Sequence, residues 1–142
     1  MLAEMKELVR AHSACVLATS SGNRPYCSLM AYATNDDASE IYMATQRSTR
    51  KFANLVANPA VSLMIDTRNE VPRPEVRALT VEGTCAPIAD PARKEQVRTQ
   101  LLASHPQLAT FLDHEDCAIL CVTVTSFLLL KGLTDAHYVA LD

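Results

Sequence analysis

The segment Glu40–Asp66, EIYMATQRSTRKFANLVANPAVSLMID, decides how this chain folds. It reads as a strand, a basic loop, a short helix and a second strand. Apolar side chains recur at helical spacing over residues 52–56, and Pro59 requires the helix to end by Asn58. Residues 60–66 are almost continuously apolar, which is typical of a buried strand.

Positive charge gathers where this helix is expected to begin. The loop and first turn contain Arg47, Ser48, Thr49, Arg50 and Lys51, with no acidic residue among them. The N–H groups at a helix N-terminus carry partial positive charge, so cations there are normally unfavourable. We expect Ser48 to cap the helix. The cations and hydroxyls together predict an anion site, with phosphate as the expected ligand.

The flanking sequence predicts mainly antiparallel strands. On the N-terminal side we expect a helix over 2–12, strands over 14–19 and 25–34, and a return strand over 40–45. The small polar residues between these strands indicate hairpins, which pair strands antiparallel.

The C-terminal half continues this pattern. A strand is expected over 76–88, with a bulge at Gly83. Asp90 and Pro91 are typical of a helix start, so we expect a helix to about 104, followed by a second short helical segment. Strands then follow over 117–130 and 137–141. The prediction is one domain over residues 1–142, mainly β, with six to seven antiparallel strands, peripheral helices and a barrel-like closure.

Composition excludes several classes of protein. The chain has 142 residues, 49% hydrophobic and 20% charged, which fits a globular domain. Its net charge of −3 argues against a nucleic-acid-binding surface. No apolar run approaches the ~20 residues that a membrane-spanning helix needs. The N-terminus has no signal-peptide pattern, so we expect a cytoplasmic protein without membrane partners.

The cysteines and histidines show no metal-ligand spacing. We interpret the five cysteines as buried, reduced thiols, at Cys15, Cys27, Cys85, Cys117 and Cys121. The last two lie in a strand-like run, where four residues span roughly 13 Å, too far for a shared ion. The four histidines are scattered along the chain. We expect no metal site.

Three ordered motifs carry a family resemblance. They are Tyr42–Thr45, Ser48–Lys51 and Asn58–Leu63. This combination resembles the pyridoxamine 5′-phosphate oxidase-like family of FMN-binding proteins, and the order of predicted elements matches over nearly the whole chain. The resemblance implies a split β-barrel of Greek-key type.

The resemblance also implies a cofactor and a site. Arg50 and Lys51 would bind the FMN phosphate, Thr45 would meet the phosphate or ribityl chain, and strand residues 28–30 would lie along the isoalloxazine ring. Family members are usually homodimers with FMN in a cleft between subunits, so residues 77–82 would reach the partner's flavin. The candidate cofactor-binding residues are Ser28, Leu29, Met30, Thr45, Arg47, Ser48, Thr49, Arg50 and Lys51.

The chain departs from the family's best-known enzymes at three places. Strand 25–32 lacks the Arg and Lys that those enzymes place there, Ala78 stands where the oxidase has Gln, and residues 136–142 lack the Arg and His motif that recognises the substrate. We therefore expect an FMN-dependent oxidoreductase that acts on another small molecule, with a small-molecule electron donor such as a reduced nicotinamide. No residue stands out as catalytic.

Three alternatives remain open on the sequence. The chain could be a non-catalytic flavin-binding or storage protein. It could be a relative of the same fold that binds haem or a deazaflavin. It could also be a structural dimer whose site is empty.

Overall fold

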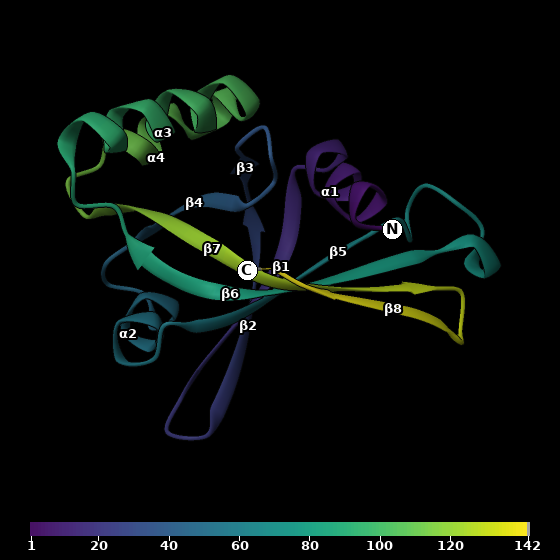
Figure 1. The fold of residues 1–142 in the computed structure, drawn as a ribbon. Coiled ribbons are helices and arrows are strands. Elements are labelled where there is room, and N and C mark those ends of the chain that lie inside the picture. Colours follow the sequence, from purple (N-terminus) through teal and green to yellow (C-terminus); the bar gives the residue numbers. More distant parts are fainter. Residues whose placement is uncertain (142) are drawn as a thin grey trace.

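A computed structural model of the chain describes residues 1–141 (Figure 1). Its strands form one antiparallel sheet in the order β2-β1-β5-β6-β7-β4-β3, and β8 pairs with β7. The helices are α1 (Leu2–Ala11), α2 (Arg50–Ala57), α3 (Pro91–Ser104) and α4 (Ala109–Asp113). The strands are β1 (Ala14–Ser21), β2 (Arg24–Ala31), β3 (Ala33–Thr34), β4 (Glu40–Gln46), β5 (Ala60–Asp66), β6 (Arg77–Pro87), β7 (Cys117–Lys131) and β8 (Asp135–Ala140).

The sheet curls around its longest strand. β7 pairs with β6 along its length, and along its other edge it pairs first with β4 and then with β8. The β6–β7 register shifts between Glu82 and Gly83, which confirms the predicted bulge. A Cβ at Gly83 would lie 2.4 Å from the carbonyl oxygen of Thr123, so only glycine fits this close approach. The curled sheet confirms the expected mainly-β split-barrel fold.

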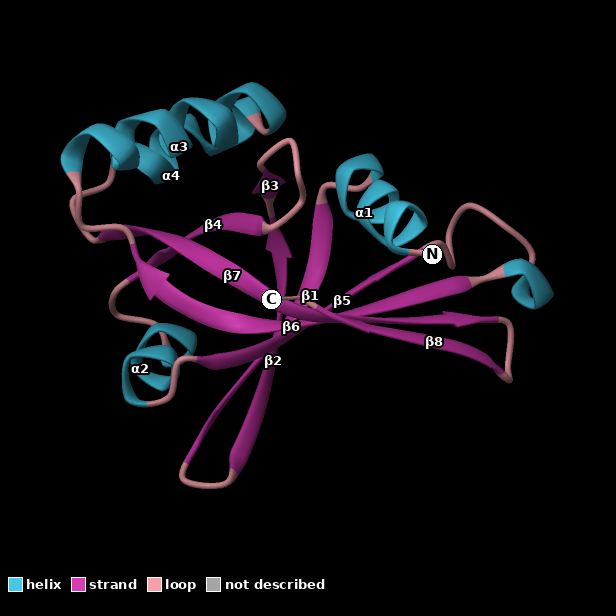
Figure 2. Cartoon of the chain, viewed as in Figure 1, coloured by secondary structure: helices cyan, strands magenta, loops and turns pink. Residues whose placement is uncertain are grey.

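The helices lie around the periphery of this sheet, as Figure 2 shows. α1 covers the main core with Met5 and Val9, which contact the inward side chains of the strands. Because alternate strand residues face opposite sides, Tyr42 and Ile119 point away from that core. They form a smaller cluster with Leu101 of α3. Within residues 1–141, no helix is long and apolar enough to cross a membrane.

The structure divides the strand expected over 25–34. Tyr32 interrupts it: β2 pairs with β1, whereas β3 pairs with β4. The Tyr32 hydroxyl donates to the carbonyl of Val9 at 2.7 Å, and its own carbonyl lies 2.8 Å from Nε2 of His105. The chain therefore crosses between two parts of the sheet at this residue.

Two local predictions are wrong. Ser48 does not cap α2: Thr49 does, with Oγ1 accepting from the backbone N–H of Phe52 at 3.3 Å. The Ser48 N–H instead donates to Oδ2 of Asp116, which is distant in sequence. Cys27 is exposed, unlike the other four free thiols. It lies midway along β2, an edge strand that pairs only with β1, where little packs against it.

Candidate functional site

A cavity of ≈ 240 Å³ lies between β2, the end of β4 and the start of α2. It brings together several predicted cofactor residues, namely Leu29, Met30, Thr45, Thr49 and Lys51. The remaining lining residues are Ala31, Ala44, Gln46, Leu108 and Phe111.

One end of this cavity is polar. Thr45 is buried, and its Oγ1 lies 3.1 Å from Oγ1 of Thr49. Thr49 also donates to the carbonyl of Gln46 at 2.9 Å, which fixes its hydroxyl at the helix start. Lys51 is half-buried and has no ion pair within residues 1–141. An ammonium group without a countercharge beside two hydroxyls can bind a phosphate.

The rest of the cavity is largely apolar. Met30 is buried, Leu29 is 79% exposed, and Leu108 and Phe111 add further apolar side chains to the lining. Among the described residues that line it, Lys51 is the only titratable one. An apolar wall with a cation at one end suits a flat aromatic ring that carries a tethered phosphate.

Arg47 and Ser48 lie outside this cavity. The Arg47 guanidinium donates to the carbonyls of Cys117 and Glu115, at 3.0 and 3.4 Å. The Ser48 N–H donates to Asp116 at 3.2 Å. Both contacts fasten the basic loop to the start of β7. Asp116 thus places a carboxylate beside the basic loop, which contains no acidic residue itself. The sequence of the loop alone does not predict this contact, because Asp116 is distant in the chain.

Arg50 and Ser28 also lie outside it. Consecutive helical residues point about 100° apart, so Arg50 and Lys51 face different hollows. The Arg50 guanidinium lies over the ring of Tyr26, 5.5 Å from its centroid. Ser28 pairs with Leu17 across the β1–β2 ladder and does not line the cavity. The cofactor roles expected for these residues and for Arg47 and Ser48 stay predictions.

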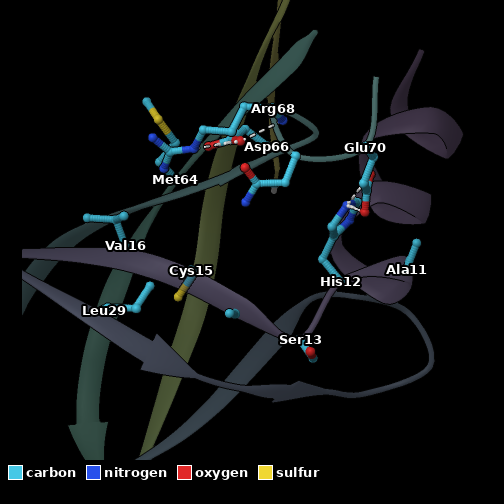
Figure 3. A pocket seen from close by; sticks show the side chains of 12 residues that line it. Ala11, His12, Ser13, Cys15, Val16, Leu29, Met64, Asp66, Arg68 and Glu70 are labelled. Carbon is cyan, nitrogen blue, oxygen red and sulfur yellow. Dashed lines mark hydrogen bonds and ion pairs between the residues drawn. The ribbon is translucent and has the colours of Figure 1, made fainter. Parts of the chain in front are cut away.

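A second cavity of ≈ 300 Å³ lies between α1, β1, β5 and the loop after β5 (Figure 3). Nδ1 of His12 lies 2.8 Å from the carbonyl oxygen of Leu8, and Nε2 lies 2.9 Å from Oε1 of Glu70. Partial burial disfavours the charged imidazolium, but the Leu8 carbonyl and the carboxylates of Glu70 and Asp66 outweigh it and raise the pKa of His12. Leu29 lines both cavities.

The described part of the chain contains no cluster of three His, Cys, Asp or Glu side chains that could hold a metal ion.

Comparison with known proteins identifies the family and the fold. The sequence pattern of the Pyridoxamine 5′-phosphate oxidase family matches residues 1–130. No curated protein matches the sequence.

Solved structures share the fold at low sequence identity. A heme binding protein from Mycobacterium smegmatis has a TM-score of 0.86 and 16% identity, covering 99% of this chain and 58% of that one. A FAD-binding protein from Mesorhizobium loti has a TM-score of 0.75 and 16% identity, covering 89% and 91%.

A third structure is a protein from Clostridium acetobutylicum related to general stress protein 26, of the pyridoxinephosphate oxidase family. Its TM-score is 0.77 and its identity 23%, covering 99% of this chain and 94% of that one. The chain thus spans little more than half of the heme binding protein but nearly all of the other two. From the family match over residues 1–130, the chain belongs to the pyridoxamine 5′-phosphate oxidase family.

Proposed function

We propose that the protein binds FMN in the ≈ 240 Å³ cavity and works as an oxidoreductase on a small molecule. The observation that carries this proposal is the position of Lys51, which has no ion pair within residues 1–141. It lines the polar end of an apolar cavity together with the buried hydroxyl of Thr45. A flavin mononucleotide has the matching parts, an anionic phosphate joined to a largely apolar ring.

The lining residues fit this cofactor in two ways. Lys51 and the hydroxyls of Thr45 and Thr49 would hold the phosphate. Leu29 and Met30 would pack against the ring. The flavin would supply the redox chemistry, while the protein binds it, orients it and limits the access of water.

We include a second copy of the chain in the proposal. The cavity is smaller than the ~300–1,000 Å³ of typical ligand pockets, which suggests that a second chain completes its wall. Leu29, at its mouth, is 79% exposed.

An apolar row on the outer face of the sheet offers a surface for that second copy. Six residues lie in register across neighbouring strands: Leu29, Val16, Met64, Thr80, Leu128 and Tyr138. Met64 and Tyr138 are 42% and 64% exposed. Figure 3 shows Val16, Leu29 and Met64 on adjacent strands beside the second cavity. All of these side chains except Thr80 are apolar or aromatic, and a largely apolar strip of this kind favours burial against an identical strip, as a two-fold dimer provides. We call it the outer row.

The proposed compartment is the cytoplasm. All five cysteines are free thiols, which fits a reducing environment.

The first experiment is purification followed by reconstitution with FMN. A yellow protein that releases FMN on denaturation, or a colourless one that binds added FMN, is the expected result. A red protein with haem absorption, or one that binds no flavin, would contradict the proposal.

A flavin store without turnover is the second candidate. It is favoured by the lining of the cavity, where Lys51 is the only titratable residue among those described. Oxidation of reduced nicotinamide by the FMN-loaded protein, measured by loss of absorbance, separates the two candidates. Turnover is expected for the oxidoreductase, and its absence with several donors would favour storage.

A further inference from the structure

The loop after β5 forms one wall of the second cavity, the ≈ 300 Å³ space between α1, β1 and β5 (Figure 3). The lining residues from that side are Asp66, Arg68, Asn69 and Glu70. Three members of the outer row also line this cavity, namely Val16, Leu29 and Met64. The position of the loop therefore affects how open the cavity is to solvent.

One side-chain contact fastens the tip of this loop. Nε2 of His12 lies 2.9 Å from Oε1 and 3.1 Å from Oε2 of Glu70, and Figure 3 shows the two side chains pointing toward each other. Within residues 1–141, no other side-chain hydrogen bond or ion pair joins residues 69–71 to a helix or strand. The backbone N–H groups of Glu70 and Val71 donate to the carbonyl of Thr67, inside the loop itself. His12, directly after α1, thus holds the loop tip against that helix.

This contact requires a charged imidazole. Nδ1 of His12 lies 2.8 Å from the carbonyl oxygen of Leu8, so both ring nitrogens face oxygens that accept hydrogen bonds. Only the imidazolium carries an N–H on both nitrogens, whereas the neutral ring carries one and can keep one of the two contacts. Leu8 is buried and fixed inside α1, while Glu70 is exposed on the loop. Loss of the proton therefore breaks the contact with Glu70.

The other charged and titratable groups around the cavity do not replace this contact. The Asp66 carboxylate pairs with Nε of Arg68 at 3.1 Å and accepts from the Arg68 backbone N–H at 2.9 Å, so it is already occupied. On β1, Cys15 is buried, and this burial raises the pKa of its thiol to about 12, so the thiol stays uncharged near neutral pH. His12 is the group whose charge changes in the neutral range.

We propose that His12 and Glu70 form a pH-dependent latch, which holds the loop tip over the second cavity while His12 is protonated and releases it when His12 loses its proton to solvent. Burial opposes the charge on His12, but the Leu8 carbonyl and Glu70 outweigh it and raise the pKa, so release begins above pH 6.5. Because Leu29 lines both this cavity and the proposed FMN cavity, the latch controls access to a space beside the flavin site.

The test follows the full chain by NMR as the pH rises from 5.5 to 8.5. The Met64 methyl group reports on the cavity that it lines, and the methyl group of Met43, which is fully buried and does not line this cavity, is the internal reference. We expect the Met64 signal to shift with the same midpoint as the His12 imidazole, while the Met43 signal stays constant. Amide exchange at Glu70 and Val71, corrected for its intrinsic dependence on pH, should lose roughly fivefold in protection.

Three variants separate the latch from a general effect of pH. His12→Gln removes the titrating group and should abolish the step in the Met64 signal. Glu70→Gln should also abolish it, because an amide both donates and accepts and so can contact either form of His12. His137→Gln is the matched control: His137 pairs with Asp135 at 2.8 Å on β8, outside the cavity, and this variant should titrate like wild type. Melting temperatures establish which variants fold, and either latch variant alone is sufficient for the test.

A titration of His12 that leaves the Met64 methyl and the loop amides unchanged would overturn the proposal. So would a step that persists in His12→Gln or in Glu70→Gln. None of these measurements needs a flavin. A protein that binds no FMN but shows the step would contradict the proposed function and leave this inference standing, and one that binds FMN without the step would do the reverse.

Discussion

The Oγ1 atoms of Thr45 and Thr49 lie 3.1 Å apart and join the end of β4 to the cap of α2. Thr49 accepts from the backbone N–H of Phe52 and donates to the carbonyl of Gln46. The strand end and the helix start are therefore held at a fixed separation, and this separation shapes the polar end of the proposed FMN cavity.

Replacing Thr45 with Val removes a buried hydroxyl from this pair. We expect the free energy of unfolding to fall by about 1 kcal/mol, because the Thr49 oxygen loses a partner. FMN affinity should also fall, because the proposal has this hydroxyl hold the flavin phosphate. Urea unfolding and flavin titration measure the two effects, and Thr45→Ser, which keeps the hydroxyl, is the control. A Val variant as stable as wild type would contradict the structural role.

Gly83→Ala tests the close approach of β6 and β7. A Cβ at this position would lie 2.4 Å from the Thr123 carbonyl oxygen and 2.8 Å from a methyl carbon of Val122. Because backbone must shift to relieve the contact, we expect a loss of about 1–3 kcal/mol in unfolding free energy. Glu82→Ala, at the exposed neighbouring position, should stay within about 0.5 kcal/mol. A fully stable alanine variant would show that the bulge tolerates a side chain.

His12 predicts a pH dependence of stability. Its pKa in the folded protein is raised above the ordinary 6.5, despite partial burial, by the Leu8 carbonyl and the carboxylates of Glu70 and Asp66. A raised folded pKa means that the stabilisation is fully present below about pH 6.5 and is lost as the pH rises through the folded value. Arg68 pairs with Asp66 and reduces the influence of that carboxylate.

The corresponding measurement compares the unfolding free energy of wild type and His12→Gln from pH 5.5 to 8.5. We expect wild type to have a higher unfolding free energy than His12→Gln at low pH, and this difference to shrink as the pH rises. Glu70→Gln should reduce the stabilisation by His12 at low pH. A difference in unfolding free energy between wild type and His12→Gln that is constant across this range would show that His12 does not titrate in its contact with Glu70.

The outer row predicts the oligomeric state. Sedimentation should give twice the 15.5 kDa chain mass for wild type. Leu128→Glu should lower it to the monomer, because the row would then bury an unpaired charge. Leu133→Glu is the matched control: Leu133 is 84% exposed but lies in the β7–β8 turn, off the row. A monomeric wild type, or a dimer insensitive to Leu128→Glu, would contradict the proposed interface.

Elements with strong local signals were predictable from the sequence. β5 has the expected bounds, Ala60–Asp66, because Pro59 and the polar residues after it delimit an apolar run. α3 begins after Asp90, whose carboxylate accepts from the N–H of Arg93 at 3.0 Å. The family resemblance, carried by ordered motifs, is confirmed by the match over residues 1–130.

The finer arrangement of the site was not predictable. The approach of Asp116 to Ser48 depends on the pairing of β4 with β7, which no local pattern encodes. Arg50 and Lys51 line different hollows, and this depends on which other elements pack against each side of α2. Sequence alone grouped these cations into one anion site, whereas the structure distributes them around the helix start.

The most direct test of the central proposal is an FMN titration of wild type, Lys51→Ala and Lys94→Ala. Lys94 is a lysine on α3, outside the proposed FMN cavity. We predict that Lys51→Ala weakens FMN binding at least tenfold, about 1.4 kcal/mol, and that Lys94→Ala stays within twofold of wild type. Equal FMN affinity in all three proteins would contradict the proposal that Lys51 holds the flavin phosphate.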